Sequence, residues 1–158
     1  GLEFRRVLFR SPVAGEAVFF DAGAYRCAGC HSFAGRGRMV APDLAMRVSH
    51  LTDEQLVHRI IHVADRKAEP GYRPVTLETR GGRLITGLLV MMNTGDTMRI
   101  YDTATLPPVL LEIPKEEVVA VRPRTESVMP RDYAARLSLQ QLADVVSFLR
   151  SDAGAAAK

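Results

Sequence analysis

Two stretches of the chain place apolar residues at helical spacing directly after a capping box. The first begins at Thr52, where residues 52–55 read Thr-Asp-Glu-Gln, and its apolar stripe consists of Leu56, Ile60 and Val63. The second begins at Ser138, and four apolar residues then share one helical face: Leu139, Leu142, Val146 and Leu149. We therefore predict one helix that starts at residue 52 and another over residues 139–151.

A third helix is predicted over residues 12–25, near the start of the chain. Pro12 suits the first turn of a helix, Gly15 allows close contact with another helix, and Phe19 offers an apolar contact. The segment after residue 31 differs, because it has no periodicity and contains Gly35, Gly37 and Pro42. We predict that this segment is a loop as far as residue 50.

The middle of the chain alternates with the period of β-strands. Val75, Leu77 and Thr79 alternate with polar residues, and Gly81-Gly82 then suits a two-residue hairpin turn. Further strand-like runs follow at residues 84–92, 98–100, 109–113 and 118–121. Short strands at this density favour a small closed antiparallel barrel of SH3- or Sm-like type over residues 71–122. The predicted fold class is therefore α+β, mainly α-helical with an inserted antiparallel β-barrel.

The composition is that of a globular protein. The chain has 158 residues, of which 47% are hydrophobic and 25% charged, and this balance excludes wholesale disorder. No run of about 18 apolar residues occurs, so no membrane-spanning helix is predicted. Only 6% of the residues are aromatic and none is Trp. A core this poor in large rings is either small or filled by a group that is not an amino acid.

The net charge depends on the first residues of the chain. Residues 2–11 (LEFRRVLFRS) resemble the translation of a sequencing-adapter oligonucleotide, so we expect residues 1–11 to be an artefact. A genuine basic, amphipathic N-terminal arm is the alternative. Leaving out this segment lowers the formal charge from +3 to +1. On this interpretation the natural N-terminus, with any signal peptide, lies outside the sequence.

The predicted barrel carries no basic excess. Residues 71–122 contain six basic and six acidic side chains, with Tyr72 and Tyr101 as the aromatic residues that bases could stack on. Because phosphate binding requires a basic excess, we expect no nucleic-acid partner.

The two cysteines lie in the run Cys27-Ala28-Gly29-Cys30-His31, which is the attachment pattern of c-type haem. The spacing suits this chemistry, because two thiols on one turn of chain can add to the two vinyl groups on one porphyrin edge. His31 then lies under the iron as the proximal ligand. Three alternatives remain open: a redox dithiol, a structural disulfide, and a zinc site completed by His58 and His62.

Helices that bracket this motif resemble those of a class I c-type cytochrome, where the first and last helices cross beside the haem. The resemblance implies a distal Met in the loop before the last helix, and Met129 in Val128-Met129-Pro130 has that position. It also implies that a Pro carbonyl accepts the N–H of the proximal His. The segment Ala41-Pro42-Asp43-Leu44 resembles the family's Gly-Pro-x-Leu, which gives this role to Pro42. Other axial ligands stay open: Met39, Met46, His50, His58 and His62.

A barrel inserted between His31 and Met129 makes residues 15–150 similar to the planctomycete-type haem-binding domain. The segment at residues 72–87 and the helix at residues 142–149 contribute to this resemblance. The predicted organisation is a cytochrome c domain of residues 12–70 and 123–158, interrupted by the barrel. The resemblance implies a module of a larger envelope protein, often one with a dehydrogenase-like region.

The predicted function is electron transfer by a covalently bound haem c with His31 and Met129 as axial ligands. No catalytic constellation is visible, so we do not expect an enzyme. The expected partner is a redox protein or a fused dehydrogenase-like domain. Haem c is attached outside the cytoplasm, which places the protein in the periplasm or cell envelope. If Met129 does not bind the iron, the open position would suit a haem-based sensor or a peroxidase-like site.

Overall fold

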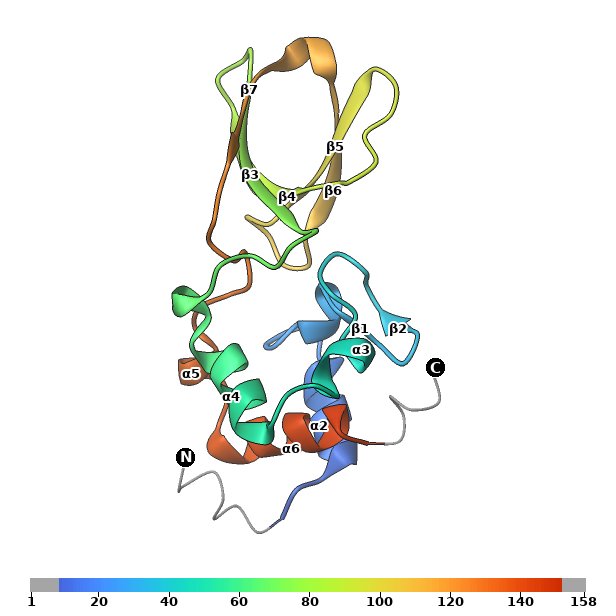
Figure 1. Cartoon of the computed structure of the whole chain (residues 1–158), viewed down its shortest axis with the longest axis vertical. Coiled ribbons are helices and arrows are strands. Elements are labelled where there is room, and N and C mark those ends of the chain that lie inside the picture. Colours follow the sequence, from blue (N-terminus) through green and yellow to red (C-terminus); the bar gives the residue numbers. More distant parts are fainter. Residues whose placement is uncertain (1–8, 152–158) are drawn as a thin grey trace. The chain divides into compact units, whose positions relative to one another are not determined.

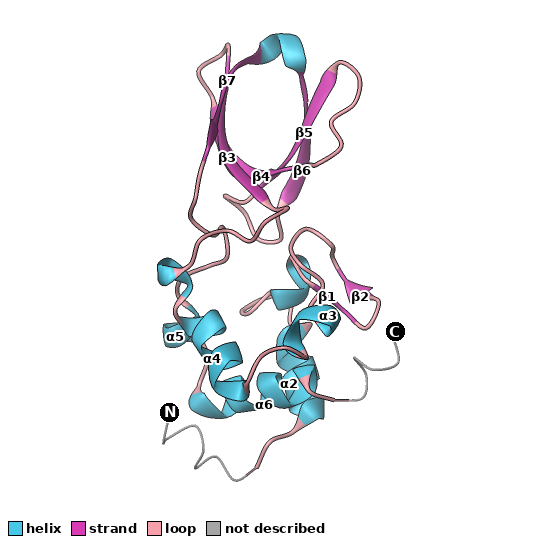
Figure 2. Cartoon of the chain, viewed as in Figure 1, coloured by secondary structure: helices cyan, strands magenta, loops and turns pink. Residues whose placement is uncertain are grey.

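The computed structural model describes residues 9–151, and they divide into two compact units (Figures 1 and 2). The helical unit contains the chain up to Val63 and from Pro130 onward, and the sheet unit contains Ala64–Met129. The sheet unit includes segments on both sides of the predicted insert at residues 71–122. These segments pair with each other, because the Ala68 N–H donates to the Thr125 carbonyl at 2.8 Å and Lys67 forms a β-bridge with Glu126.

The predicted α+β class is confirmed, since helices and an antiparallel sheet occupy separate stretches of the chain. The elements of the helical unit are α2 (Pro12–Phe19), η1 (Cys27–Gly29), β1 (Ser32–Phe33), β2 (Arg36–Gly37), α3 (Ala45–Val48), α4 (Asp53–Ile61), α5 (Tyr133–Arg136) and α6 (Leu139–Leu149). A short helix, η2 (Val63–Asp65), follows α4. No helix among residues 9–151 is long and apolar enough to cross a membrane.

Both predicted capping boxes are confirmed. The Thr52 hydroxyl accepts the Gln55 N–H, while the Gln55 side chain accepts the Thr52 N–H. Ser138 and Gln141 make the same reciprocal pair at the start of α6. Each box satisfies two backbone donors that have no partner within the helix, and this fixes where the helix begins.

The prediction of a helix over residues 12–25 is wrong in its extent, because α2 ends at Phe19. The Asp21 carboxylate accepts the backbone N–H groups of Gly23, Ala24 and Tyr25, so the chain forms a side-chain-capped turn there. These hydrogen bonds lower the pKa of Asp21.

The predicted loop at residues 32–50 also contains regular structure. Strands β1 and β2 form a hairpin, and α3 follows at Ala45–Val48. The hairpin turn consists of Ala34 (φ 54°) and Gly35 (φ 75°), both in the left-handed region that a two-residue hairpin turn requires. The absence of periodicity did not exclude such short elements.

The core of the helical unit lies where α2 packs on α6. A Cβ added at Gly15 would come within 1.9 Å of the Asp144 carbonyl, so only glycine allows this contact. Next to it, Phe19, Phe33 and Phe148 are buried, and the rings of Phe33 and Phe148 meet edge to face with centroids 4.9 Å apart. This aromatic cluster holds the two terminal helices together beside β1.

The sheet unit contains five antiparallel strands in the order β6-β5-β4-β3-β7. They are β3 (Arg73–Thr79), β4 (Leu84–Leu89), β5 (Thr97–Asp102), β6 (Val109–Pro114) and β7 (Val118–Pro123), with η3 (Lys115–Glu117) between the last two. The predicted alternation holds for Val75 and Leu77, which are buried together with Ile85 and Ile100. It ends before Thr79, which is half-buried and follows a register shift between β3 and β7 at Glu78/Thr79. Within residues 9–151, β6 and β7 are the two edges of this sheet and do not pair with each other, so the prediction of a closed barrel over residues 71–122 is wrong in its closure. The five strands form a curved sheet (Figure 1).

Candidate haem-attachment site

The Cys27-to-His31 motif forms one tight turn of chain. Cys27 begins η1, and its carbonyl accepts the N–H groups of Cys30 at 3.2 Å and His31 at 2.9 Å. Arg26, directly before the turn, has φ 58° in the left-handed region. The turn therefore gathers both cysteines and His31 within one loop of the helical unit.

Both cysteines are free thiols and are not joined in a disulfide. Burial raises the pKa of the Cys27 thiol from 9.0 to about 11. Burial also raises the pKa of the Cys30 thiol, although the Arg38 guanidinium acts in the opposite direction. Redox-active dithiols depend on a cysteine with a lowered pKa. Here burial raises the pKa of both thiols, which does not favour a redox-active dithiol.

The His31 ring has a defined partner. Its Nδ1 atom lies 2.7 Å from the Pro42 carbonyl oxygen. A carbonyl can only accept a hydrogen bond, so this contact puts the proton on Nδ1 and the lone pair of the neutral ring on Nε2. A metal-bound imidazole needs this arrangement. The contact is the one that the cytochrome resemblance implies for Pro42.

The backbone around Pro42 is held close to the residue after His31. The Ser32 hydroxyl donates to the Asp43 carboxylate, and the Ser32 carbonyl accepts the Leu44 N–H at 3.0 Å. Ser32 is only 4% exposed, so these bonds are shielded from water. They tie residues 43–44 to the motif and thereby set the position of the Pro42 carbonyl.

Gly37 lies directly against the motif. A Cβ at this position would come within 2.3 Å of the His31 carbonyl, and the backbone has φ 96°. In the sequence, Gly37 indicates only a loop. Its role in allowing β2 to pass His31 depends on a contact that the sequence pattern does not reveal.

Side chains from the C-terminal segment hold the backbone before Cys27. The Tyr133 hydroxyl donates to the Tyr25 carbonyl at 2.5 Å, and Arg136 donates to the Ala24 carbonyl at 3.0 Å. Gln141 donates to the Tyr25 hydroxyl at 2.7 Å. Burial raises the pKa of the Tyr133 phenol, so that it stays a donor. No local pattern in the sequence marks these residues, because more than 100 positions separate each from its partner.

The predicted site residues fall into both units. Cys27, Cys30, His31 and Pro42 belong to the helical unit, while Met129 is the last residue of the sheet unit. Met129 is half-buried, and its N–H donates to the Ser127 hydroxyl at 3.2 Å. Its role as axial ligand stays a prediction. The alternative ligands Met39 and Met46 are 80% and 73% exposed.

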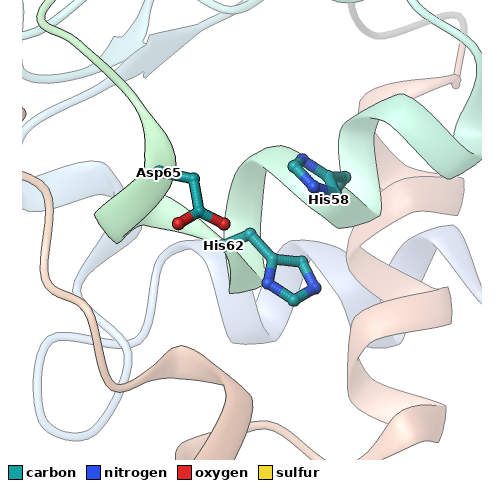
Figure 3. Close-up of side chains that lie close together, drawn as sticks. All are labelled: His58, His62 and Asp65. Atoms are coloured by element: carbon teal, nitrogen blue, oxygen red, sulfur yellow. The ribbon is translucent and has the colours of Figure 1, made fainter.

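Among the described residues, one group of three side chains has the donor atoms for a metal ion. It consists of His58, His62 and Asp65 (Figure 3) and does not include Cys27 or Cys30. The structure thus brings together the two histidines of the zinc alternative without the two cysteines.

A scan against protein-family models and a search of curated proteins returned no match to the chain.

Proposed function

We propose that the helical unit covalently binds a c-type haem through Cys27 and Cys30, with His31 as the proximal ligand, and that the protein carries electrons. The observation that carries the proposal is the 2.7 Å contact between His31 Nδ1 and the Pro42 carbonyl, directly after a CxxCH motif. This contact fixes the ring tautomer that binds a metal through Nε2.

The residues present fit a haem c. Two free thiols two residues apart are the groups that add to the porphyrin vinyls, and the imidazole follows at the next position. When bound, the iron would supply one-electron chemistry by cycling between its ferrous and ferric states. Ser32 and Asp43 would hold the Pro42 carbonyl against His31. Tyr133 and Gln141 would hold the backbone that leads into Cys27.

Met129 is our proposal for the distal ligand. It lies nine residues before Ser138, the N-cap of the last helix, in the kind of position from which class I cytochromes supply their distal Met. A thioether ligand would raise the reduction potential and close the iron to small molecules. Without this ligand, the same site would suit a sensor or a peroxidase-like enzyme.

The CxxCH motif also leads to our proposals for the fold, the cellular location and the partner of the protein. We propose a cytochrome c fold, formed by α2, α6 and the motif loop and interrupted by a curved sheet of SH3- or Sm-like type, as in the planctomycete-type haem-binding domain. The packing of α2 on α6 next to the motif loop supports this fold. Because haem c is attached where an oxidising folding system manages thiols, we place the protein in the periplasm or envelope, where it serves a redox protein or a fused dehydrogenase-like domain.

Covalent attachment tests the proposal directly. The chain is produced together with a haem c maturation system, and the product is denatured and analysed by mass spectrometry and visible absorption. We expect one haem that stays attached after denaturation. The Cys27→Ser, Cys30→Ser double variant should lose it, whereas Ser32→Ala, which keeps both thiols, should retain it. A chain that leaves the maturation system without covalent haem would contradict the proposal.

A further inference from the structure

His58, His62 and Asp65 lie together on the surface at the end of α4 (Figure 3). His58 is in the last turn of α4 and His62 caps that helix, so the two imidazoles are four residues apart and share one side of it. Their rings are stacked, with centroids 4.6 Å apart and planes inclined by 30°. Asp65 ends η2, three residues after His62.

The three donor groups have the spacing of a metal site. One ligand atom from each residue lies within 4.8 Å of the other two. Nitrogen and oxygen ligands at about 2.0–2.1 Å from a tetrahedral Zn²⁺ are roughly 3.3 Å from one another. The observed spacing is therefore at most about 1.5 Å greater than in a formed site, and the three side chains are exposed.

We propose that His58, His62 and Asp65 bind a divalent transition-metal ion of the Zn²⁺ class. Two imidazoles and one carboxylate are the donor set of many protein zinc sites, and three protein ligands leave a position for water. All three side chains are exposed, so an ion can reach them from solvent. The site is separate from the CxxCH motif and does not depend on haem binding.

The end of the helix favours a cation at this position. The unsatisfied carbonyl groups of a helix C-terminus carry partial negative charge; His58 lies in the last turn of α4 and His62 is its C-cap. Arg59 is next to His58, but one residue turns about 100° around a helix, so Arg59 starts from a different side of α4. Arg66 and Lys67 follow Asp65, and the Arg66 guanidinium pairs with the Glu69 carboxylate at 3.1 Å. Asp65 adds the negative charge that a neutral imidazole pair lacks.

Calorimetric titration with Zn²⁺ tests the site on the full chain in two forms. In the haem-loaded form, thioether bonds remove the thiols as competing ligands. In the haem-free form, the Cys27→Ser, Cys30→Ser double variant has no thiols, so failure of the haem proposal would not affect this test. We expect one equivalent of Zn²⁺ to bind in whichever form is folded.

Single substitutions identify the ligands. His58→Ala and His62→Ala should each weaken Zn²⁺ binding by more than the roughly 10- to 100-fold that loss of an outer-shell partner costs. Asp65→Asn should also weaken it. His50→Ala is the matched control, because His50 is exposed and lies outside the cluster. Absence of Zn²⁺ binding, or equal weakening by His50→Ala and His62→Ala, would overturn the proposal.

Discussion

The hydrogen bond between His31 and Pro42 connects a sequence motif to a chemical property. The five residues of the motif supply two thiols and an imidazole, but the tautomer of His31 depends on a carbonyl eleven positions away. The bonds of Ser32 to Asp43 and Leu44 keep that carbonyl in place. At the residue scale, the site is therefore prepared by its surroundings as well as by its motif.

Tyr133 offers a test of how firmly the segment before Cys27 is held. Tyr133→Phe keeps the buried ring but removes its hydrogen bond to the Tyr25 carbonyl. We expect the free energy of unfolding to fall by about 1 kcal/mol. Tyr133→Ala also removes the buried ring, which is 3% exposed, and should cost about 3–5 kcal/mol. Urea denaturation of both variants measures the two losses, and an unchanged stability of Tyr133→Phe would show that the hydroxyl contributes nothing.

The buried thiol of Cys27 makes a prediction about pH. In the haem-free chain its pKa is raised from 9.0 to about 11, so at pH 8 the thiolate fraction should be about 100-fold lower than for an unshifted thiol. Iodoacetamide should therefore modify Cys27 slowly in the folded Cys30→Ser variant and rapidly after denaturation. Mass spectrometry of timed samples gives both rates, and equal rates would contradict burial of the thiol.

The raised pKa of Cys27 also makes the stability of the haem-free chain depend on pH. The folded state binds the thiol proton more tightly than the unfolded state does, so the stabilising contribution is complete below pH 9. It is lost as the pH rises from 9 toward 11. Cys27→Ala in the haem-free chain should flatten this part of the stability profile, measured by denaturant unfolding at several pH values.

At the scale of elements, the contact of α2 with α6 depends on Gly15. Gly15→Ala places a methyl group within 1.9 Å of the Asp144 carbonyl, so the helices must separate. We expect a loss of about 1–3 kcal/mol, as for other overpacked cores. Gly23→Ala is the control, because its Cβ would meet nothing closer than 3.6 Å. Thermal melts of the two variants should differ clearly, and matching melts would contradict close packing at Gly15.

Local signals predicted the element boundaries that depend on local chemistry. The capping boxes at Thr52 and Ser138 gave the starts of α4 and α6 correctly, since each box acts within four residues. The end of α2 was wrong, although its signal was present: Asp21 accepts three backbone N–H groups that follow it. The β1–β2 hairpin was missed, because two-residue strands have no measurable period.

In the candidate site, too, the residues that share a local motif were predictable and those brought together by the fold were not. Cys27, Cys30 and His31 are contiguous, so the motif could be found in the sequence alone. Pro42 could be assigned only through a family resemblance. Tyr133, Gln141 and Gly37 act through contacts that the fold creates, and no local pattern marks them.

For the whole molecule, the two units have separate hydrophobic cores. One core contains Phe19, Phe33 and Phe148, and the other contains Leu77, Ile85 and Ile100. Gly87→Ala should disrupt the sheet unit, because its Cβ would lie 1.9 Å from the Tyr101 carbonyl, whereas Gly81→Ala should not. We expect Gly87→Ala to lower the stability of the sheet without preventing covalent haem attachment, as measured by hydrogen exchange and haem yield. Loss of attachment would show that the units do not fold separately.

The visible spectrum of the matured protein, oxidised and reduced, beside that of Met129→Ala tests the central claim most directly. Met46→Ala is the matched control, because it removes a methionine that is 73% exposed and belongs to the helical unit. We predict a covalent low-spin haem whose weak far-red sulfur–iron band disappears in Met129→Ala and persists in Met46→Ala. A low-spin spectrum unchanged by Met129→Ala would assign the distal position to another residue, and a high-spin spectrum of the unmodified chain would contradict the electron-carrier account.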